Sequence, residues 1–213
     1  MLVETMKLAH PMQSVIPSAH GAVLGVLART SEPMTGRRIA TLTRPRFSQS
    51  RVNRVLGELA RDGIADVDVR PPASYYRLNR EHVAAPGILA LASMWQTLLD
   101  RIQASLSEWP TQPVATWLFG SAARAEADAA SDLDVLVVRP DRLSDDETWH
   151  ERLDDFADQA RRWSGNTCEV LVLTESELQA AVRRGDRLVD ELRRDAIHLA
   201  GAQPHALLGR RAS

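Results

Sequence analysis

The chain has 213 residues, a length that suits two domains of about 100 residues better than a single small one. Hydrophobic residues make up 44% and charged residues 25%, which is ordinary globular usage and excludes disordered, collagen-like and disulfide-rich classes. No apolar run approaches the roughly 18 residues needed to cross a bilayer, and Cys168 is the only cysteine. We therefore expect a cytoplasmic protein with no membrane partner.

Charge is divided unequally along the chain. Residues 1–85 hold 12 basic and 7 acidic side chains, whereas residues 86–213 hold 14 and 21. Within residues 29–54 there are seven arginines and one acid, Glu32. A polyanion is a plausible partner for the first half, and a solvated basic face is the alternative.

The sequence pattern of the first half predicts three helices followed by a hairpin. Helical patterns cover residues 18–29, 36–43 and 48–62, with Ser18, Ser48 or Ser50 as caps. Alternating strand patterns follow at 64–69 and 74–79, on either side of a Pro-Pro turn. This order is the layout of a winged helix-turn-helix domain, which we place at residues 1–85.

The second half alternates strands and helices. One helix is predicted between about Pro86 and Ser107, within a linker at 86–110. Strand patterns at 114–119, 132–138 and 168–173 then alternate with helical patterns that begin at Gly120, Asp145 and the capping box of Thr174. The fold class is therefore α+β and α/β in two domains, the second at residues 111–213.

Two carboxylates mark the strongest chemical signal. Asp132 and Asp134 are two apart on a predicted strand, so both project from one face while Leu133 and Val135 point into the core. Adjacent carboxylates repel unless a cation lies between them, and Mg²⁺ is held by such oxygens together with substrate phosphates. An isolated Asp-x-Asp occurs more often at a surface turn, but this pair continues into the buried run VLVV.

A Gly-Ser pair lies eleven residues earlier. Gly120 and Ser121 occupy the turn from the first strand into a helix, where backbone N–H groups and a hydroxyl can approach a phosphate. Alone, the pair would read as a glycine turn with a serine cap. Its place just before the two carboxylates favours a phosphate site.

These residues together resemble the nucleotidyltransferases of the DNA polymerase beta type, particularly their minimal prokaryotic domains. The family pattern is Gly-Ser at a strand-to-helix turn, an arginine, and Ser-Asp-x-Asp on the next strand, and it is matched by Gly120, Ser121, Arg124, Ser131, Asp132 and Asp134. Ala125 departs from the glycine found in many members. The resemblance covers about residues 112–201 and implies a mixed sheet flanked by helices, with DAIHLAG as its closing strand.

The resemblance also implies an activity. The family uses a third carboxylate on a later strand, for which Glu169 in CEVLVL is the candidate, a solvent-exposed strand-end acid being the alternative. Asp132, Asp134 and Glu169 would hold two Mg²⁺ ions, and Gly120, Ser121, Arg124 and Ser131 would hold the triphosphate. The implied reaction moves a nucleoside monophosphate from a triphosphate, expected to be ATP, to an acceptor hydroxyl.

Residues 48–61 resemble the recognition helix of winged helix regulators of the MarR or ArsR type. Its exposed face would present side chains that read base edges or hold phosphates: Gln49, Ser50, Arg51, Asn53 and Arg54. Arg70, Tyr75 and Arg77 fall on the predicted wing. Double-stranded DNA and a second copy in a homodimer are the expected partners, and a domain for protein contacts or dimerisation is the alternative.

Three functions remain open on sequence alone. The first is an active nucleotidyltransferase whose winged helix targets DNA, including that of its own operon. The second is a transcription regulator whose inactive transferase domain senses nucleotides. The third is an antitoxin that adenylylates a partner toxin or another protein acceptor. A complete acidic triad, which depends on Glu169, favours catalysis.

Overall fold

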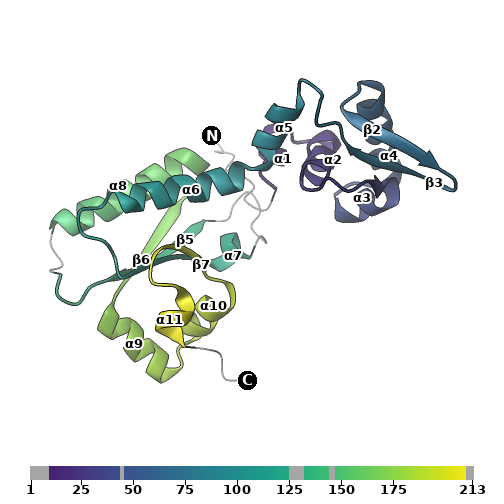
Figure 1. Cartoon of the computed structure of the whole chain (residues 1–213). Coiled ribbons are helices and arrows are strands. Elements are labelled where there is room, and N and C mark those ends of the chain that lie inside the picture. The colour runs from purple at the N-terminus through teal and green to yellow at the C-terminus, as the bar shows by residue number, and fades with distance from the viewer. Residues whose placement is uncertain (1–9, 44–45, 125–131, 144–146, 210–213) are drawn as a thin grey trace. The chain divides into compact units, whose positions relative to one another are not determined.

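The computed structural model describes residues 10–43, 46–124, 132–143 and 147–209. Contacts divide the chain into two compact units, His10–Trp95 and a second unit that begins at Gln96. The chain is a mixed α and β protein (Figure 1). Across the described ranges, no helix is both long and apolar enough to span a membrane.

The first unit packs helices against a small antiparallel sheet. In chain order its elements are α1 (Met12–Val15), α2 (Ala19–Ala28), β1 (Met34–Thr35), α3 (Gly36–Leu42), α4 (Gln49–Arg61), β2 (Ala65–Arg70), β3 (Ala73–Leu78) and α5 (Ala85–Ala92). The strand order is β1-β3-β2. Apolar side chains spaced three and four apart on α4, among them Val52 and Leu56, meet Leu27 and Ile39 in one core.

Local sequence signals set the ends of α4. The Ser48 hydroxyl accepts the Arg51 N–H at 3.4 Å, so Ser48 and not Ser50 is the cap. Gly63 follows the helix with φ +73°, a conformation that favours glycine. Ser18 precedes α2 as expected, but its side chain makes no capping hydrogen bond.

The helix predicted between Pro86 and Ser107 is instead two helices, α5 and α6 (Met94–Ser107). Ser93 separates them, and its hydroxyl donates to the carbonyls of Leu89 and Ala90 at 3.0 and 3.1 Å. A serine that bonds to nearby backbone in this way competes with regular helix geometry. Hydrophobic periodicity continues across Ser93 and therefore does not reveal the break.

The second unit is built on a mixed four-stranded sheet in the order β6-β5-β4-β7. Its further elements are β4 (Ala115–Phe119), α7 (Gly120–Ala123), β5 (Leu133–Arg139), α8 (Glu147–Ser164), β6 (Cys168–Thr174), α9 (Glu175–Arg184), α10 (Arg187–Asp195), β7 (Ile197–Gly201) and α11 (Pro204–Leu208). β5 and β6 are parallel, whereas β4 is antiparallel to both β5 and β7. The mixed sheet flanked by helices is confirmed.

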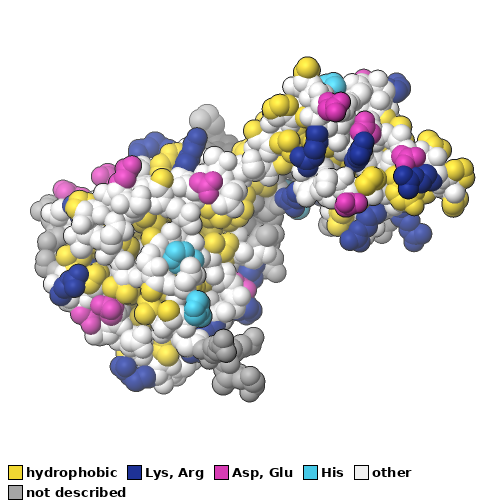
Figure 2. Space-filling model, viewed as in Figure 1, with side chains coloured by type: hydrophobic (Ala, Val, Ile, Leu, Met, Phe, Trp, Pro, Cys, Tyr) yellow, Lys and Arg dark blue, Asp and Glu magenta, His cyan; other side chains and the backbone are white. Residues whose placement is uncertain are grey.

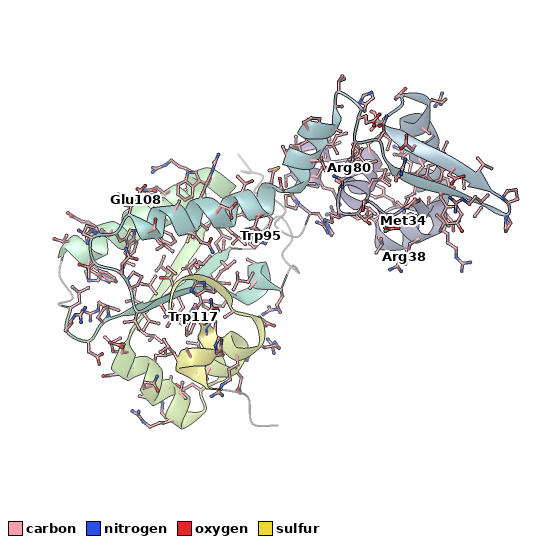
Figure 3. The ribbon with its side chains drawn as sticks, viewed as in Figure 1. Met34, Arg38, Arg80, Trp95, Glu108 and Trp117 are labelled. Atoms are coloured by element: carbon pink, nitrogen blue, oxygen red, sulfur yellow. The ribbon has the colours of Figure 1, made fainter. Side chains whose placement is uncertain are left out.

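Helices of the second unit pack against its sheet. Trp117 and Leu136 belong to a buried cluster with Leu178 of α9 and Leu192 of α10, and the Trp117 indole N–H also donates to the Ala202 carbonyl at 2.8 Å (Figure 3). α8 packs against β6. In β5, which lies between β4 and β6, Leu133 and residues 135–138 are fully buried. Asp134 is the partly exposed residue among them, so the sheet is open to solvent at that point.

Candidate functional site

Two acids lie side by side on the parallel strands of the second unit. Asp134 of β5 is in register with Glu169 of β6, and paired residues of neighbouring strands project from the same face. Asp132 lies one residue before β5, two positions from Asp134. Glu169 is exposed and the two aspartates are partly exposed. Leu133, which lies between the aspartates, and Val135, which follows Asp134, are fully buried. The three predicted carboxylates therefore occupy one accessible edge of the sheet, here called the carboxylate edge.

The electrostatics of this edge are those of crowded acids. Burial raises the pKa of Asp134 above its ordinary value, and the neighbouring charges of Glu169 and Asp132 raise that pKa further. Arg124 opposes this effect, and Glu191 of α10 adds to it. A cation at the edge would relieve the repulsion that favours a proton on Asp134.

Gly120 and Ser121 begin α7, immediately after β4. Phe119 pairs with Asp134 across the antiparallel ladder, which brings the next residue, Gly120, against the Asp134 carboxylate. Gly120 has φ +71°. The turn thus places two of the predicted phosphate-binding residues beside the carboxylate edge.

Arg124 follows α7 and forms an ion pair with Asp195 at the end of α10, with 3.3 Å between guanidinium Nη1 and carboxylate Oδ2. The same oxygen accepts from Arg194 Nε at 2.8 Å. The Asp195 side chain is 12% exposed, so this contact lies largely out of water. Arg124 is therefore held close to Asp134 by an acid from another element.

Sequence reasoning missed the two acids of α10, Glu191 and Asp195. They lie about 60 residues after Asp134, and only the fold brings them near it. The segment does carry a helical signal, because Leu188, Val189 and Leu192 repeat at spacings of one, three and four. That signal would have identified α10, although not the contact with Arg124.

Three further observations concern the residues near this edge. Ser131 lies outside the described residues. Cys168 is partly buried, and burial followed by the charge of Asp134 raises its pKa to about 12, so the thiol stays protonated and is a poor nucleophile. Within residues that the structure describes, no three His, Cys, Asp or Glu side chains form a group ready to hold a metal ion. The acids share an edge but do not form a closed cage.

The second predicted surface is on the first unit. Five α4 side chains expected to contact DNA are exposed: Gln49, Ser50, Arg51, Asn53 and Arg54. Arg77 of β3 is paired with Asp66 at 3.0 Å, and Arg70 of β2 is paired with Asp68 at 2.5 Å. Both hairpin arginines thus have an acidic partner on the hairpin itself.

Comparison with known proteins finds a similarity to one family model and to one solved structure. Among curated proteins there is no match. A solved structure described as the crystal structure of a toxin-antitoxin with AMP-PNP is 18% identical, covers 52% of this chain and 80% of that chain, and has a TM-score of 0.37. The family model of the nucleotidyltransferase domain matches residues 99–193. That segment contains β4, β5, β6 and the whole carboxylate edge.

Proposed function

We propose that the second unit transfers a nucleoside monophosphate from a nucleoside triphosphate, with ATP as the expected donor, to a hydroxyl acceptor. The observation that carries this proposal is the parallel register of Asp134 with Glu169, next to Asp132 and the Gly120 turn. All four residues lie inside the segment that matches the nucleotidyltransferase family. In the reaction, the acceptor oxygen bonds to the α-phosphorus, the bond from that phosphorus to the β-phosphate oxygen breaks, and pyrophosphate leaves.

The donor set of the carboxylate edge fits Mg²⁺. Carboxylate oxygens are the ligands that this hard cation prefers, and the crowding that raises the pKa of Asp134 is the repulsion that a divalent ion would neutralise. Asp132, Asp134 and Glu169 would hold two ions. When bound, such ions supply charge neutralisation of the triphosphate and activation of the attacking hydroxyl.

The other residues of the site bind and orient the substrate. Gly120 and Ser121 would present backbone N–H groups and a hydroxyl to the β- and γ-phosphates, and Ser131 would add a second hydroxyl. Arg124, held near Asp134 by Asp195, would place a guanidinium beside the same phosphates. Glu169, the most exposed of the three acids, would accept the proton of the acceptor hydroxyl.

For the first unit we propose a winged helix-turn-helix that binds double-stranded DNA as a homodimer. Three helices precede the β2–β3 hairpin, and the exposed face of α4 carries arginine and amide side chains suited to phosphates and base edges. This arrangement supports a DNA-targeted transferase. A protein toxin encoded nearby is the acceptor that we would test first.

The test is a transfer assay with ATP labelled at the α-phosphate and, as acceptor, the protein encoded by the adjacent gene. Wild-type protein should attach label to the acceptor. Glu169→Gln should still bind ATP but lose transfer by at least about tenfold, because its proton-accepting oxygen is removed. The matched control is Glu175→Gln, which changes an exposed glutamate of α9 and should retain transfer.

Two outcomes would oppose this function. If wild-type protein binds ATP and transfers no label, the second unit acts as a nucleotide sensor and the regulator alternative holds. If Glu169→Gln transfers label at the wild-type rate, the third acid is a different residue.

A further inference from the structure

Several exposed arginines of the first unit have no acidic partner among the described residues, and four of them lie on two neighbouring helices. Arg37 and Arg38 lie on α3, and Arg51 and Arg54 lie on α4. In the ranges that the structure describes, no carboxylate lies within ion-pairing distance of any of them. Glu58, four residues after Arg54, is paired instead with His20 at 2.9 Å. These four positive charges are therefore not neutralised within the described protein.

Close packing joins α3 and α4 into one surface. A Cβ placed on Gly36 would lie 2.5 Å from the Asn53 amide oxygen and 3.4 Å from Leu56. Gly36 therefore lets α3 approach the exposed side of α4 at Asn53, one residue before Arg54. Arg37 and Arg38 follow Gly36 directly, at the end of α3 that contacts α4. Figure 3 places Arg38 on the outward side of α3.

The hairpin has the opposite charge balance. Arg77 and Asp66 form one ion pair across β3 and β2, and Arg70 and Asp68 form another along β2. The Arg70 guanidinium also lies 5.7 Å from the centre of the Tyr75 ring. Each hairpin arginine is matched by one carboxylate, so these pairs offer no net positive charge to a phosphate. An arginine already paired with an acid also gives up that contact, a weak one between exposed side chains, when it turns to another anion.

We propose that this protein grips a nucleic-acid duplex through a basic surface made of Arg37, Arg38, Arg51 and Arg54, and that Arg70 and Arg77 of the hairpin contribute no phosphate contacts. The inference rests on the proposed DNA binding and deepens it by assigning two residues, Arg37 and Arg38, that the α4 pattern alone does not include. Figure 2 shows Lys and Arg side chains gathered on the surface where Figure 1 draws α3. The Asn53 amide lies against Gly36, at the contact between the two helices that carry these arginines.

Salt dependence of duplex binding measures these contacts directly, because each neutralised phosphate contributes about 0.9 to the slope of log K against log salt. The full-length chain is titrated with a fluorescent DNA duplex of about 24 base pairs, long enough to span two half-sites, at several NaCl concentrations. Arg37→Gln/Arg38→Gln should reduce the slope by about 1.8 for each bound protomer, since each protomer loses two phosphate contacts. All substituted side chains are exposed, and circular dichroism melting checks that each variant is folded.

The control variant is Asp66→Asn/Asp68→Asn/Arg70→Gln/Arg77→Gln. It removes both hairpin ion pairs and leaves the net charge unchanged, so the slope should stay at the wild-type value. A lower slope for this variant, or an unchanged slope for Arg37→Gln/Arg38→Gln, would overturn the inference while leaving DNA binding intact. No binding of the duplex by wild-type protein at low salt would instead contradict the proposed function of the first unit.

Discussion

At the carboxylate edge, the Cα of Gly120 packs directly against the Asp134 side chain, and there is no room for a Cβ between them. The pairing of Phe119 with Asp134 creates this approach, and φ +71° at Gly120 sustains it. The same glycine therefore serves the turn, which needs a left-handed residue, and the acid, which needs the space. The Gly-Ser turn therefore also leaves space for the Asp134 carboxylate.

Substitution of Gly120 tests both the left-handed turn and the contact with Asp134. Gly120→Ala should cost about 1 to 2 kcal/mol for the left-handed backbone, and it should also displace Asp134 and abolish nucleotide transfer. Gly185 is the matched control, since it has φ +67° and a Cβ added there would meet no described atom within 4 Å. Gly185→Ala should lose similar stability and keep its activity. Urea unfolding and the transfer assay measure both, and equal activity of the two variants would contradict the contact.

Asp195 should act on the site only through Arg124. Asp195→Asn removes the ion pair that holds Arg124 beside Asp134, so we expect a loss of about 1 to 2 kcal/mol in the free energy of unfolding. The KM for ATP should rise several-fold while kcat changes little, since the acid touches no reacting atom. Asp190→Asn, on the same helix with a 69% exposed side chain, should change neither quantity. A fall in kcat with unchanged KM would assign Asp195 a different role.

The hydroxyl of Thr116 is a polar group in the apolar core of the second unit. Thr116 is fully buried in β4, and among the described residues its oxygen has no hydrogen-bond partner. Thr116→Val keeps the shape and removes the orphaned group, so it should stabilise the protein by about 1 kcal/mol. Thr116→Ser keeps the hydroxyl and loses a methyl group, and it should destabilise. Thermal melting of the two variants decides the point, and destabilisation by valine would show that the hydroxyl is bonded.

Much of this fold could be predicted from local sequence patterns, because the residues that form a helix cap or a strand lie within a few positions of one another. The capping box is one example: Thr174 accepts the Glu177 N–H at 3.1 Å, and Glu177 accepts the Thr174 N–H at 2.8 Å. The alternation around Asp134 is another, since one face had to be buried and the other left free. Strand pairing then places Glu169 beside Asp134.

The rest depends on contacts between distant segments. The two-residue strand β1 exists only because Met34 and Thr35 pair with Tyr76 and Tyr75 of β3. Asp195 became part of the site because α10 packs near α7, about 70 residues apart in sequence. Neither contact leaves a periodic signal. The ion pair of Arg77 with Asp66 likewise depends on the sheet register, which places the two residues opposite each other.

The capping box also predicts a pH dependence. Hydrogen bonds from the Thr174 backbone and side chain hold the pKa of Glu177 below its usual value. A depressed pKa stabilises the fold above the unfolded pKa, and that contribution is lost as pH falls through the lower folded value. Glu177→Gln should therefore lower the urea midpoint at neutral pH and have a smaller effect near the ordinary glutamate pKa of about 4. An equal effect at both pH values would show that the charge of Glu177 is not involved.

Asp132, Asp134 and Glu169 should together form a metal-dependent nucleotide site, and calorimetric titration with ATP tests this without knowledge of the acceptor. Wild-type protein should bind ATP in the presence of Mg²⁺ and not in EDTA, because a triphosphate of about four negative charges is repelled by three carboxylates. Asp132→Asn/Asp134→Asn should fold normally and lose the magnesium dependence. Equal ATP affinity with Mg²⁺ and with EDTA in the wild-type protein would contradict this assignment.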